Sequence, residues 1–88
     1  MKTAFKESFA RDLKGIRDKR LLKRVRDVIE AVEQANSLSV LPHLKKLKGE
    51  QNYFRLKVGE YRIGLVVEGD AVVFVRFLAR KDIYRYFP

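Results

Sequence analysis

The stretch NYFRLKVGEYRIGLVV, from Asn52 to Val67, decides the fold of this chain. Apolar and polar residues alternate on either side of Gly59-Glu60, a pair typical of the tight turn between two antiparallel strands. A two-residue turn at this point places Lys57 directly opposite Arg62. Because a slip of one residue would move these charges into the core, the pattern predicts a β-hairpin in this register.

One face of the predicted hairpin is apolar and the other is cationic. Arg55, Lys57 and Arg62 share the cationic face, which carries no acidic residue. Like charges that face each other across two strands repel, so stability does not account for the arrangement. A site for an anion accounts for it. Charges kept only for solubility are the competing interpretation, and the charge count alone favours neither.

A third strand, predicted over Ala71–Ala79, extends the cationic face. If the preceding loop is the three residues Glu68-Gly69-Asp70, Arg76 lies opposite Arg62. A two-residue loop would turn Arg76 into the core, where an unpaired charge is costly, so we predict the longer loop. The same register turns three apolar residues toward the core: Val73, Val75 and Phe77.

Further candidate contacts for an anion lie at the two ends of this face. Arg80 ends the third strand on the same side, and Tyr84 and Tyr86 follow in RKDIYRYFP, a segment predicted to form one helical turn. Aromatic rings beside a cationic groove stack on the exposed bases of single-stranded RNA. A short basic run before the hairpin, with Lys46 and Lys48, is either a solvated loop or a contact for an RNA backbone.

The first half of the chain is predicted to form one strand and two helices. Lys2–Lys6 is assigned to an opening strand, and apolar residues with helical spacing follow it: Phe9, Leu13 and Ile16. Asp18 is the predicted N-cap of a longer amphipathic helix that ends near residues 35–37. Two such helices need a surface that covers their apolar stripe, and the apolar face of the sheet supplies it.

Length and composition limit the function classes. A chain of 88 residues makes one domain, residues 1–88, and its net charge of +9 predicts attraction to nucleic acid first, then to an acidic membrane or protein. With no cysteine, a single histidine (His43) and no nucleotide-binding fingerprint, we expect no metal site and no small-molecule cofactor. Without a bilayer-spanning apolar run or a signal peptide, we expect a cytoplasmic protein with no membrane partner.

Two blocks of the chain resemble the RelE/ParE superfamily of toxins from bacterial and archaeal toxin–antitoxin systems. They are LPHLKKLKGEQNYFRLKVGEYRIGLVV, Leu41 to Val67, and VVFVRFLARKDIYRYF, Val72 to Phe87. With the two N-terminal helices, the resemblance covers essentially the whole chain. It implies an α+β fold in which an N-terminal strand and an antiparallel helix hairpin pack on one face of a four-stranded, mainly antiparallel sheet.

The resemblance to the RelE side of the superfamily implies a toxin that is a ribosome-dependent endoribonuclease of mRNA, with a cognate antitoxin as partner. In such enzymes the ribose 2′-hydroxyl attacks the adjacent phosphate without a metal ion and leaves a cyclic phosphate. By this likeness Lys57 is the general base, and Arg62 holds the scissile phosphate with help from Arg55. Arg80 stabilises the leaving group, and Tyr84 stacks on a base. The other RNA-binding candidates are Arg76, Tyr86, Lys46 and Lys48.

The tail departs from the pattern of the superfamily. Many relatives carry histidine just before the arginine that Arg80 matches, and this chain has Ala79 there. The residue that protonates the leaving oxygen is therefore not identified by the likeness. Two other functions stay open: a ParE-type inhibitor of DNA gyrase without nuclease activity, and a decayed toxin that only binds nucleic acid. The cationic cluster favours the nuclease, since a gyrase inhibitor has no need of it.

Overall fold

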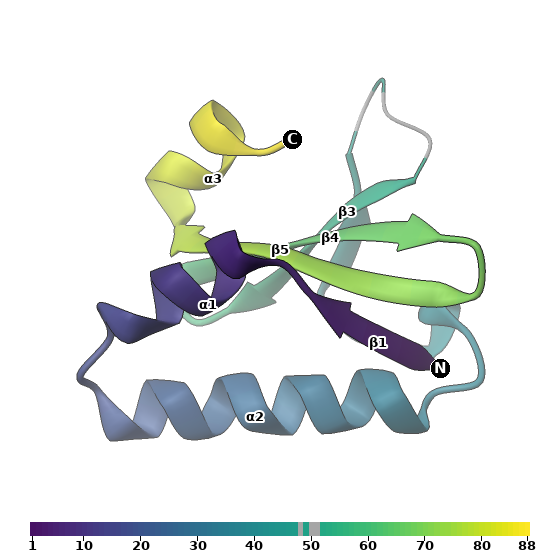
Figure 1. Ribbon diagram of the computed structural model, residues 1–88, viewed down its shortest axis with the longest axis horizontal. Coiled ribbons are helices and arrows are strands. Elements are labelled where there is room, and N and C mark those ends of the chain that lie inside the picture. The colour runs from purple at the N-terminus through teal and green to yellow at the C-terminus, as the bar shows by residue number, and fades with distance from the viewer. Residues whose placement is uncertain (48, 50–51) are drawn as a thin grey trace.

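The computed structural model describes residues 1–47, 49 and 52–88, and it contains a mixed sheet with helices on both faces (Figure 1). In chain order its elements are β1 (Lys2–Phe5), α1 (Glu7–Lys14), α2 (Lys19–Gln34), a short 3₁₀ helix (Leu38–Val40), β2 (Leu44–Lys46), β3 (Tyr53–Val58), β4 (Tyr61–Glu68), β5 (Ala71–Ala79) and α3 (Arg80–Tyr86). The five strands follow the order β1-β5-β4-β3-β2. β1 runs parallel to β5, and the other neighbouring pairs are antiparallel.

The central hairpin has the predicted register. Lys57 pairs with Arg62, and Arg55 pairs with Gly64. Gly59 opens the turn with a φ of +59°, in the left-handed region that glycine adopts without a steric penalty. The alternation of apolar and charged residues therefore determined this pairing, as the sequence indicated.

The helices cover the apolar face of the sheet. Asp18 caps α2 as predicted, because its Oδ1 accepts the backbone N–H groups of Arg20 at 3.0 Å and Leu21 at 3.2 Å. Helix and sheet side chains form one buried core: Phe9, Val25, Val32, Leu56, Val58, Ile63, Leu65, Val72, Phe74 and Phe77. Figure 1 shows α2 along one side of the sheet and α3 on the other. Within the described residues, no helix is both long and apolar enough to cross a membrane.

The prediction of four strands is wrong by one, because β2 pairs with β3 at the edge of the sheet. Its register sets Lys45 opposite Arg55 and Lys46 opposite Phe54. Three residues that include two lysines carry no strand-like alternation, so the local sequence gave no signal for β2. Lysines on a short edge strand also discourage pairing with another chain.

The predicted three-residue loop before β5 is wrong as well. Glu68 pairs with Ala71, so the turn contains only Gly69 and Asp70. The register then shifts farther along the strands: Leu65 pairs with Phe74, whereas Gly64 pairs with Arg76. One extra residue in β5 forms a β-bulge there, and the bulge returns Arg76 to the predicted cationic face.

The bulge changes which apolar residues of β5 face the helices. Val72, Phe74 and Phe77 belong to the helix-covered core, so only Phe77 of the three predicted residues is placed correctly. Val75 packs on the opposite face instead, against a second cluster beneath α3. The prediction for Val73 and Val75 failed because it assumed that side chains alternate between the two faces along an uninterrupted strand.

The closing segment forms a seven-residue helix, α3, rather than the predicted single turn. Ile83 of α3 and Phe87 just beyond it are buried together with Leu47. Tyr53, Val75 and Leu78 pack around them. The face that carries the cations is therefore partly covered by the end of the chain.

Candidate functional site

The face of the sheet that is turned away from α1 and α2 carries the predicted cations of the hairpin. Lys57 and Arg62 are direct cross-strand neighbours, while the next pair along the hairpin, Leu56 and Ile63, points into the helix-covered core. The Lys57 side chain is exposed. In the part of the chain that the structure describes, no carboxylate forms an ion pair with either residue. Two uncompensated positive charges on adjacent strands suit an anion.

Arg62 is held in place by the backbone of the β3–β4 turn. It is only 7% exposed, and its Nη1 donates to the carbonyl oxygens of Gly59 and Tyr61, each at 2.9 Å. Its Nε and Nη2 have no acceptor among the described residues, so both remain donors for a ligand. The prediction that Arg62 lies on an open face is wrong, because its guanidinium is mostly buried and fixed by the turn backbone. A donor fixed before the ligand arrives stabilises an anion without reorganisation.

Arg55 connects the sheet to α3. Its Nε donates to the Tyr84 hydroxyl oxygen at 3.2 Å, and its Nη1 donates to the His43 carbonyl oxygen at 3.2 Å. Tyr84 remains 58% exposed, so the rest of its ring is open to a base. The contact brings together two candidate residues that are 29 positions apart in the sequence.

α3 begins directly over the β3–β4 turn. The backbone N–H of Arg80 donates to the Glu60 carbonyl oxygen at 2.8 Å. Arg80 and Tyr84 are one helical turn apart and line an open hollow of about 550 Å³. Its other lining residues are Glu60, Ala79 and Lys81. Glu60, which the sequence indicated only as a turn residue, thus also lines this hollow.

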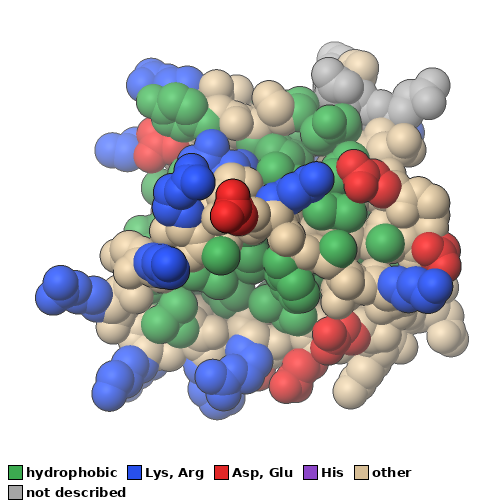
Figure 2. Space-filling model, in the orientation of Figure 1, with side chains coloured by type: hydrophobic (Ala, Val, Ile, Leu, Met, Phe, Trp, Pro, Cys, Tyr) green, Lys and Arg blue, Asp and Glu red, His purple; other side chains and the backbone are tan. Residues whose placement is uncertain are grey.

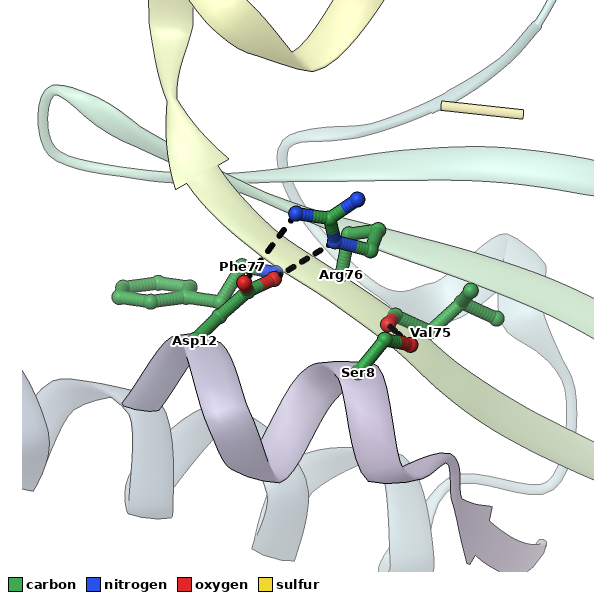
Figure 3. A network of polar contacts seen from close by, with 5 residues as sticks. All are labelled: Ser8, Asp12, Val75, Arg76 and Phe77. Atoms are coloured by element: carbon green, nitrogen blue, oxygen red, sulfur yellow. Dashed lines mark hydrogen bonds and ion pairs between the residues drawn. The ribbon is translucent and has the colours of Figure 1, made fainter. Parts of the chain in front are cut away.

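Arg76 lies on the predicted face, but its charge is already paired (Figure 3). Its Nε donates to Asp12 Oδ2 at 2.8 Å and its Nη2 to Asp12 Oδ1 at 3.2 Å. Asp12 Oδ2 also accepts the backbone N–H of Phe77 at 2.9 Å. Hydrogen bonding to Asp12 raises the pKa of Arg76 above its ordinary value, despite partial burial. The pair fastens α1 to β5, so Arg76 is not the unpaired cation that the sequence predicted.

Tyr86 lies on the other side of α3 from Tyr84. It is exposed and lines a second hollow together with Arg76. α3 therefore separates the predicted site residues into two groups. The larger group is called the hairpin cluster: Arg55, Lys57, Arg62, Arg80 and Tyr84. Among residues 1–47, 49 and 52–88, no group of three or more His, Cys, Asp or Glu side chains is placed to hold a metal ion.

The lysines before the hairpin do not all reach the cationic face. Lys46 pairs with Phe54 on the face that the helices cover, so it lies on the other side of the sheet from Arg55. Lys45, which pairs with Arg55, shares the cationic face instead. Lys48 falls outside the described residues.

A second cationic region, which the sequence analysis did not single out, lies on the helices. Figure 2 shows Lys and Arg gathered at the end of the molecule where α1 meets α2 in Figure 1. The first turn of α2 contains no acidic residue and its last turn no basic one. The basic residues of its first half and the acidic residues that follow are Lys19, Arg20, Lys23, Arg24, Arg26, Asp27, Glu30 and Glu33. This order opposes the helix dipole, so helix stability does not account for it. The order of charges along the sequence was the available signal.

Comparisons with known proteins agree on one family. A family model described as "ParE toxin of type II toxin-antitoxin system, parDE" matches residues 4–84. Toxin RelE3 of Methanocaldococcus jannaschii is 46% identical over 89 residues, which cover 100% of both chains. In a crystal structure of the RelB–RelE antitoxin–toxin complex from Methanococcus jannaschii, the matching chain has a TM-score of 0.82 and 44% identity, covering 97% of this chain and 99% of that one.

The fold also extends to distant sequences. A chain of the archaeal RelE–RelB complex from Pyrococcus horikoshii superposes with a TM-score of 0.73 at 16% identity, covering 90% of this chain and 93% of that one. At such identity the likeness concerns the fold alone. Sheet, helix hairpin and closing helix are therefore compatible with widely different side chains.

Proposed function

The chain belongs to the ParE toxin family of type II toxin–antitoxin systems, and from this premise we propose that it is a RelE-type toxin that cleaves mRNA on the ribosome. One observation carries the proposal: an exposed Lys57 and a mostly buried, fixed Arg62 are direct cross-strand neighbours on the face turned away from α1 and α2, beside Arg55 and the N-terminal end of α3. A gyrase inhibitor without nuclease activity has no need of such a cluster.

The proposed reaction is transfer of the phosphate to the neighbouring ribose hydroxyl. Lys57, in its neutral amine form, accepts the proton of the 2′-hydroxyl, and the 2′-oxygen attacks the adjacent phosphorus. The bond from phosphorus to the 5′-oxygen breaks, giving a 2′,3′-cyclic phosphate and a 5′-hydroxyl that takes its proton from water. Arg62 and Arg55 donate to the non-bridging oxygens as negative charge develops. Arg80 stabilises the leaving oxygen electrostatically, because an arginine does not give up its proton in a protein.

Tyr84 is proposed to stack on a base next to the scissile phosphate. Its ring is exposed while its hydroxyl is held by Arg55, so the ring has a fixed place beside the cations. Base stacking on an aromatic ring contributes about 1–3 kcal/mol per base and is tolerant of sequence. The proposed steps need neither a metal ion nor a cofactor.

The proposed partners are a cognate antitoxin and the translating ribosome with its mRNA, in the cytoplasm. The relative from Methanococcus jannaschii was solved as an antitoxin–toxin complex. A strongly basic toxin, at +9, suits both an acidic antitoxin segment and ribosomal RNA. Binding of an antitoxin segment to the hairpin cluster would neutralise the toxin.

The test is cleavage of a defined mRNA on purified ribosomes. We expect the wild type to produce cuts in phase with the codons, ending in cyclic phosphates, and to leave the same mRNA intact without ribosomes. The double variant Lys57→Ala, Arg62→Ala should produce no cuts while it still melts cooperatively. Intact mRNA on ribosomes would refute the nuclease. If DNA gyrase is inhibited in a parallel supercoiling assay, the ParE-type function, which the family model favours, takes its place.

The charge order of α2 predicts opposite effects on stability and binding. Replacing Lys19 and Arg20 with glutamate places acids at the positive end of the helix dipole, so the free energy of unfolding should rise by about 0.3–1 kcal/mol per residue. Affinity for ribosomes should fall because phosphate contacts are lost, and the slope of log affinity against log salt should flatten by about 0.7–0.9 per contact. Urea denaturation and co-sedimentation measure the two effects.

The matched control for this variant makes the same change in net charge elsewhere. Lys2→Glu with Lys6→Glu alters two exposed residues, one in β1 and one at the N-cap of α1, at the opposite end of α1 from its junction with α2. We expect its ribosome affinity to fall less than that of the α2 variant. Equal losses would show that only the overall charge matters.

A further inference from the structure

Gly64 lies at the centre of the cationic face of the sheet. It pairs with Arg55 on β3 and with Arg76 on β5. A Cβ atom at this position would lie 2.7 Å from Cδ2 and Cγ of Phe87 and 2.8 Å from its Cδ1. Carbon atoms do not approach that closely, so only glycine lets the Phe87 ring rest directly on the backbone of β4.

Phe87 anchors the end of α3 to this spot. The ring is 3% exposed, and its centroid lies 5.5 Å from that of Tyr53. The backbone N–H of Phe87 donates to the Ile83 carbonyl oxygen at 2.9 Å, which ties the ring to the last turn of the helix. A helix of seven residues is not stable on its own in water, so its position depends on the buried Ile83 and Phe87.

α3 also carries two residues of the hairpin cluster, which are not part of its buried face. Tyr84 meets Arg55 through its hydroxyl, and Arg80 starts the helix above Glu60. Neither residue is itself buried, so no core packing fixes their positions directly. α3 is held at its start by the backbone bond from Arg80 to Glu60 and at its end by the buried Ile83 and Phe87. The direction of the helix, and with it the placing of the Arg80 and Tyr84 side chains, therefore depends on where the Phe87 ring is seated.

We infer that the Gly64–Phe87 contact sets the position of α3 and thereby aligns Arg80 and Tyr84 with Lys57 and Arg62 for catalysis. Gly64 and Phe87 are positioning residues in this view, since neither touches the reacting atoms. The inference rests on the proposed nuclease function. A shift of about 1 Å in a catalytic group can cost a factor of 10² in rate, so a small displacement of α3 is enough to be measured.

The alternative is that α3 covers the site and must leave before RNA binds. The two cases predict opposite changes in the rate of cleavage when the contact is loosened. If the contact aligns α3, loosening it lowers the rate of cleavage. If α3 is a cover, loosening it raises the rate. The hydrogen bond between Arg55 and Tyr84 favours alignment, because it places an exposed aromatic ring beside the cations rather than over them.

The experiment compares Gly64→Ala, Phe87→Ala and their double variant with wild type. Single-turnover cleavage is measured over a range of ribosome concentrations, and hydrogen exchange is followed in α3 and in β3–β4. For each single variant we expect exchange in α3 to accelerate while β3–β4 stays protected. The maximal rate should fall roughly 10–100-fold, and the half-saturating ribosome concentration should change less than about threefold.

The double variant separates this contact from general damage. In Gly64→Ala the new methyl group meets the ring, but in the double variant no ring is present, so the double should be no slower than Phe87→Ala alone. Gly15→Ala is the matched control, because a Cβ there would lie 3.6 Å from the nearest atom and the residue has a φ of −79°. Its exchange and rate should equal those of the wild type.

Three results would overturn the inference. If the wild type is active and hydrogen exchange in α3 is unchanged in Gly64→Ala, the contact does not position α3, and the proposed nuclease function is unaffected. Faster exchange together with faster cleavage makes α3 a cover and not an aligning element. A wild type that does not cleave mRNA on ribosomes refutes the proposed function and, with it, the catalytic role of the contact, even if exchange in α3 responds.

Discussion

Replacing Lys57 with methionine is expected to lower the single-turnover rate of mRNA cleavage on the ribosome by about 10²–10⁴-fold, the usual contribution of a general base. Lys57 is exposed and forms no ion pair with a described carboxylate, so the free energy of unfolding should change by less than about 0.5 kcal/mol. Rapid-quench kinetics and urea denaturation measure the two quantities. A change in rate without a change in stability is the signature of a residue that acts in the reaction.

Two further variants define how Lys57 acts. Lys57→Arg keeps the positive charge, but arginine does not lose its proton. If Lys57 acts as a general base, Lys57→Arg should therefore cleave as slowly as Lys57→Met. A rate near that of the wild type would mean that Lys57 acts through its charge alone. Lys46→Met removes an exposed lysine from the other face of the sheet and should leave the rate within about twofold of the wild type.

Replacing Asp12 with alanine is expected to cost about 2–3 kcal/mol of folding stability, the largest loss we expect from a polar residue of this protein. The change leaves the Arg76 guanidinium without its partner and removes the acceptor of the Phe77 N–H. The side chains of Arg76 and Asp12 are only 28% and 13% exposed, so water replaces the lost contacts poorly. For a domain of this size the melting temperature should fall by roughly 4–8 °C per kcal/mol.

The ion pair between Lys2 and Asp70 offers a control for this loss. Its side chains are 76% and 74% exposed, so Asp70→Ala should cost less than about 1 kcal/mol. Adding Arg76→Met to Asp12→Ala removes the unpaired charge and should recover part of the stability. Simple addition of the two single effects would show that Asp12 acts only by holding the Phe77 N–H.

The pair between Asp12 and Arg76 also explains how a short helix is fixed on a sheet edge. β1 reaches only as far as Phe5, which pairs with Phe74 of β5. Beyond that point side chains of α1 bond to the exposed edge of β5. The Ser8 hydroxyl donates to the Val75 carbonyl oxygen, and Asp12 accepts from the Phe77 N–H (Figure 3). Side chains of a helix thereby satisfy backbone groups that a strand would otherwise pair.

Local pattern was sufficient for the hairpin and for α2. The alternation from Tyr53 to Val67 tolerates one register only, because a slip would turn Arg55, Lys57 and Arg62 toward the apolar core beneath the helices. The Asp18 cap and the apolar stripe of α2 follow from rules that act within a few residues. The neighbouring positions of Lys57 and Arg62, on which the proposed site depends, were therefore already contained in the sequence.

Packing between distant segments determined what local pattern missed. β2 has no alternation of its own, and the bulge that turns Arg76 outward has no signature in the sequence around Val75. Asp12 and Arg76 meet across 64 positions, and Phe87 meets Gly64 only because the chain returns over the sheet. A periodic pattern fixes which face a side chain occupies. It does not reveal which remote segment covers that face, since such contacts depend on the shape of the assembled core.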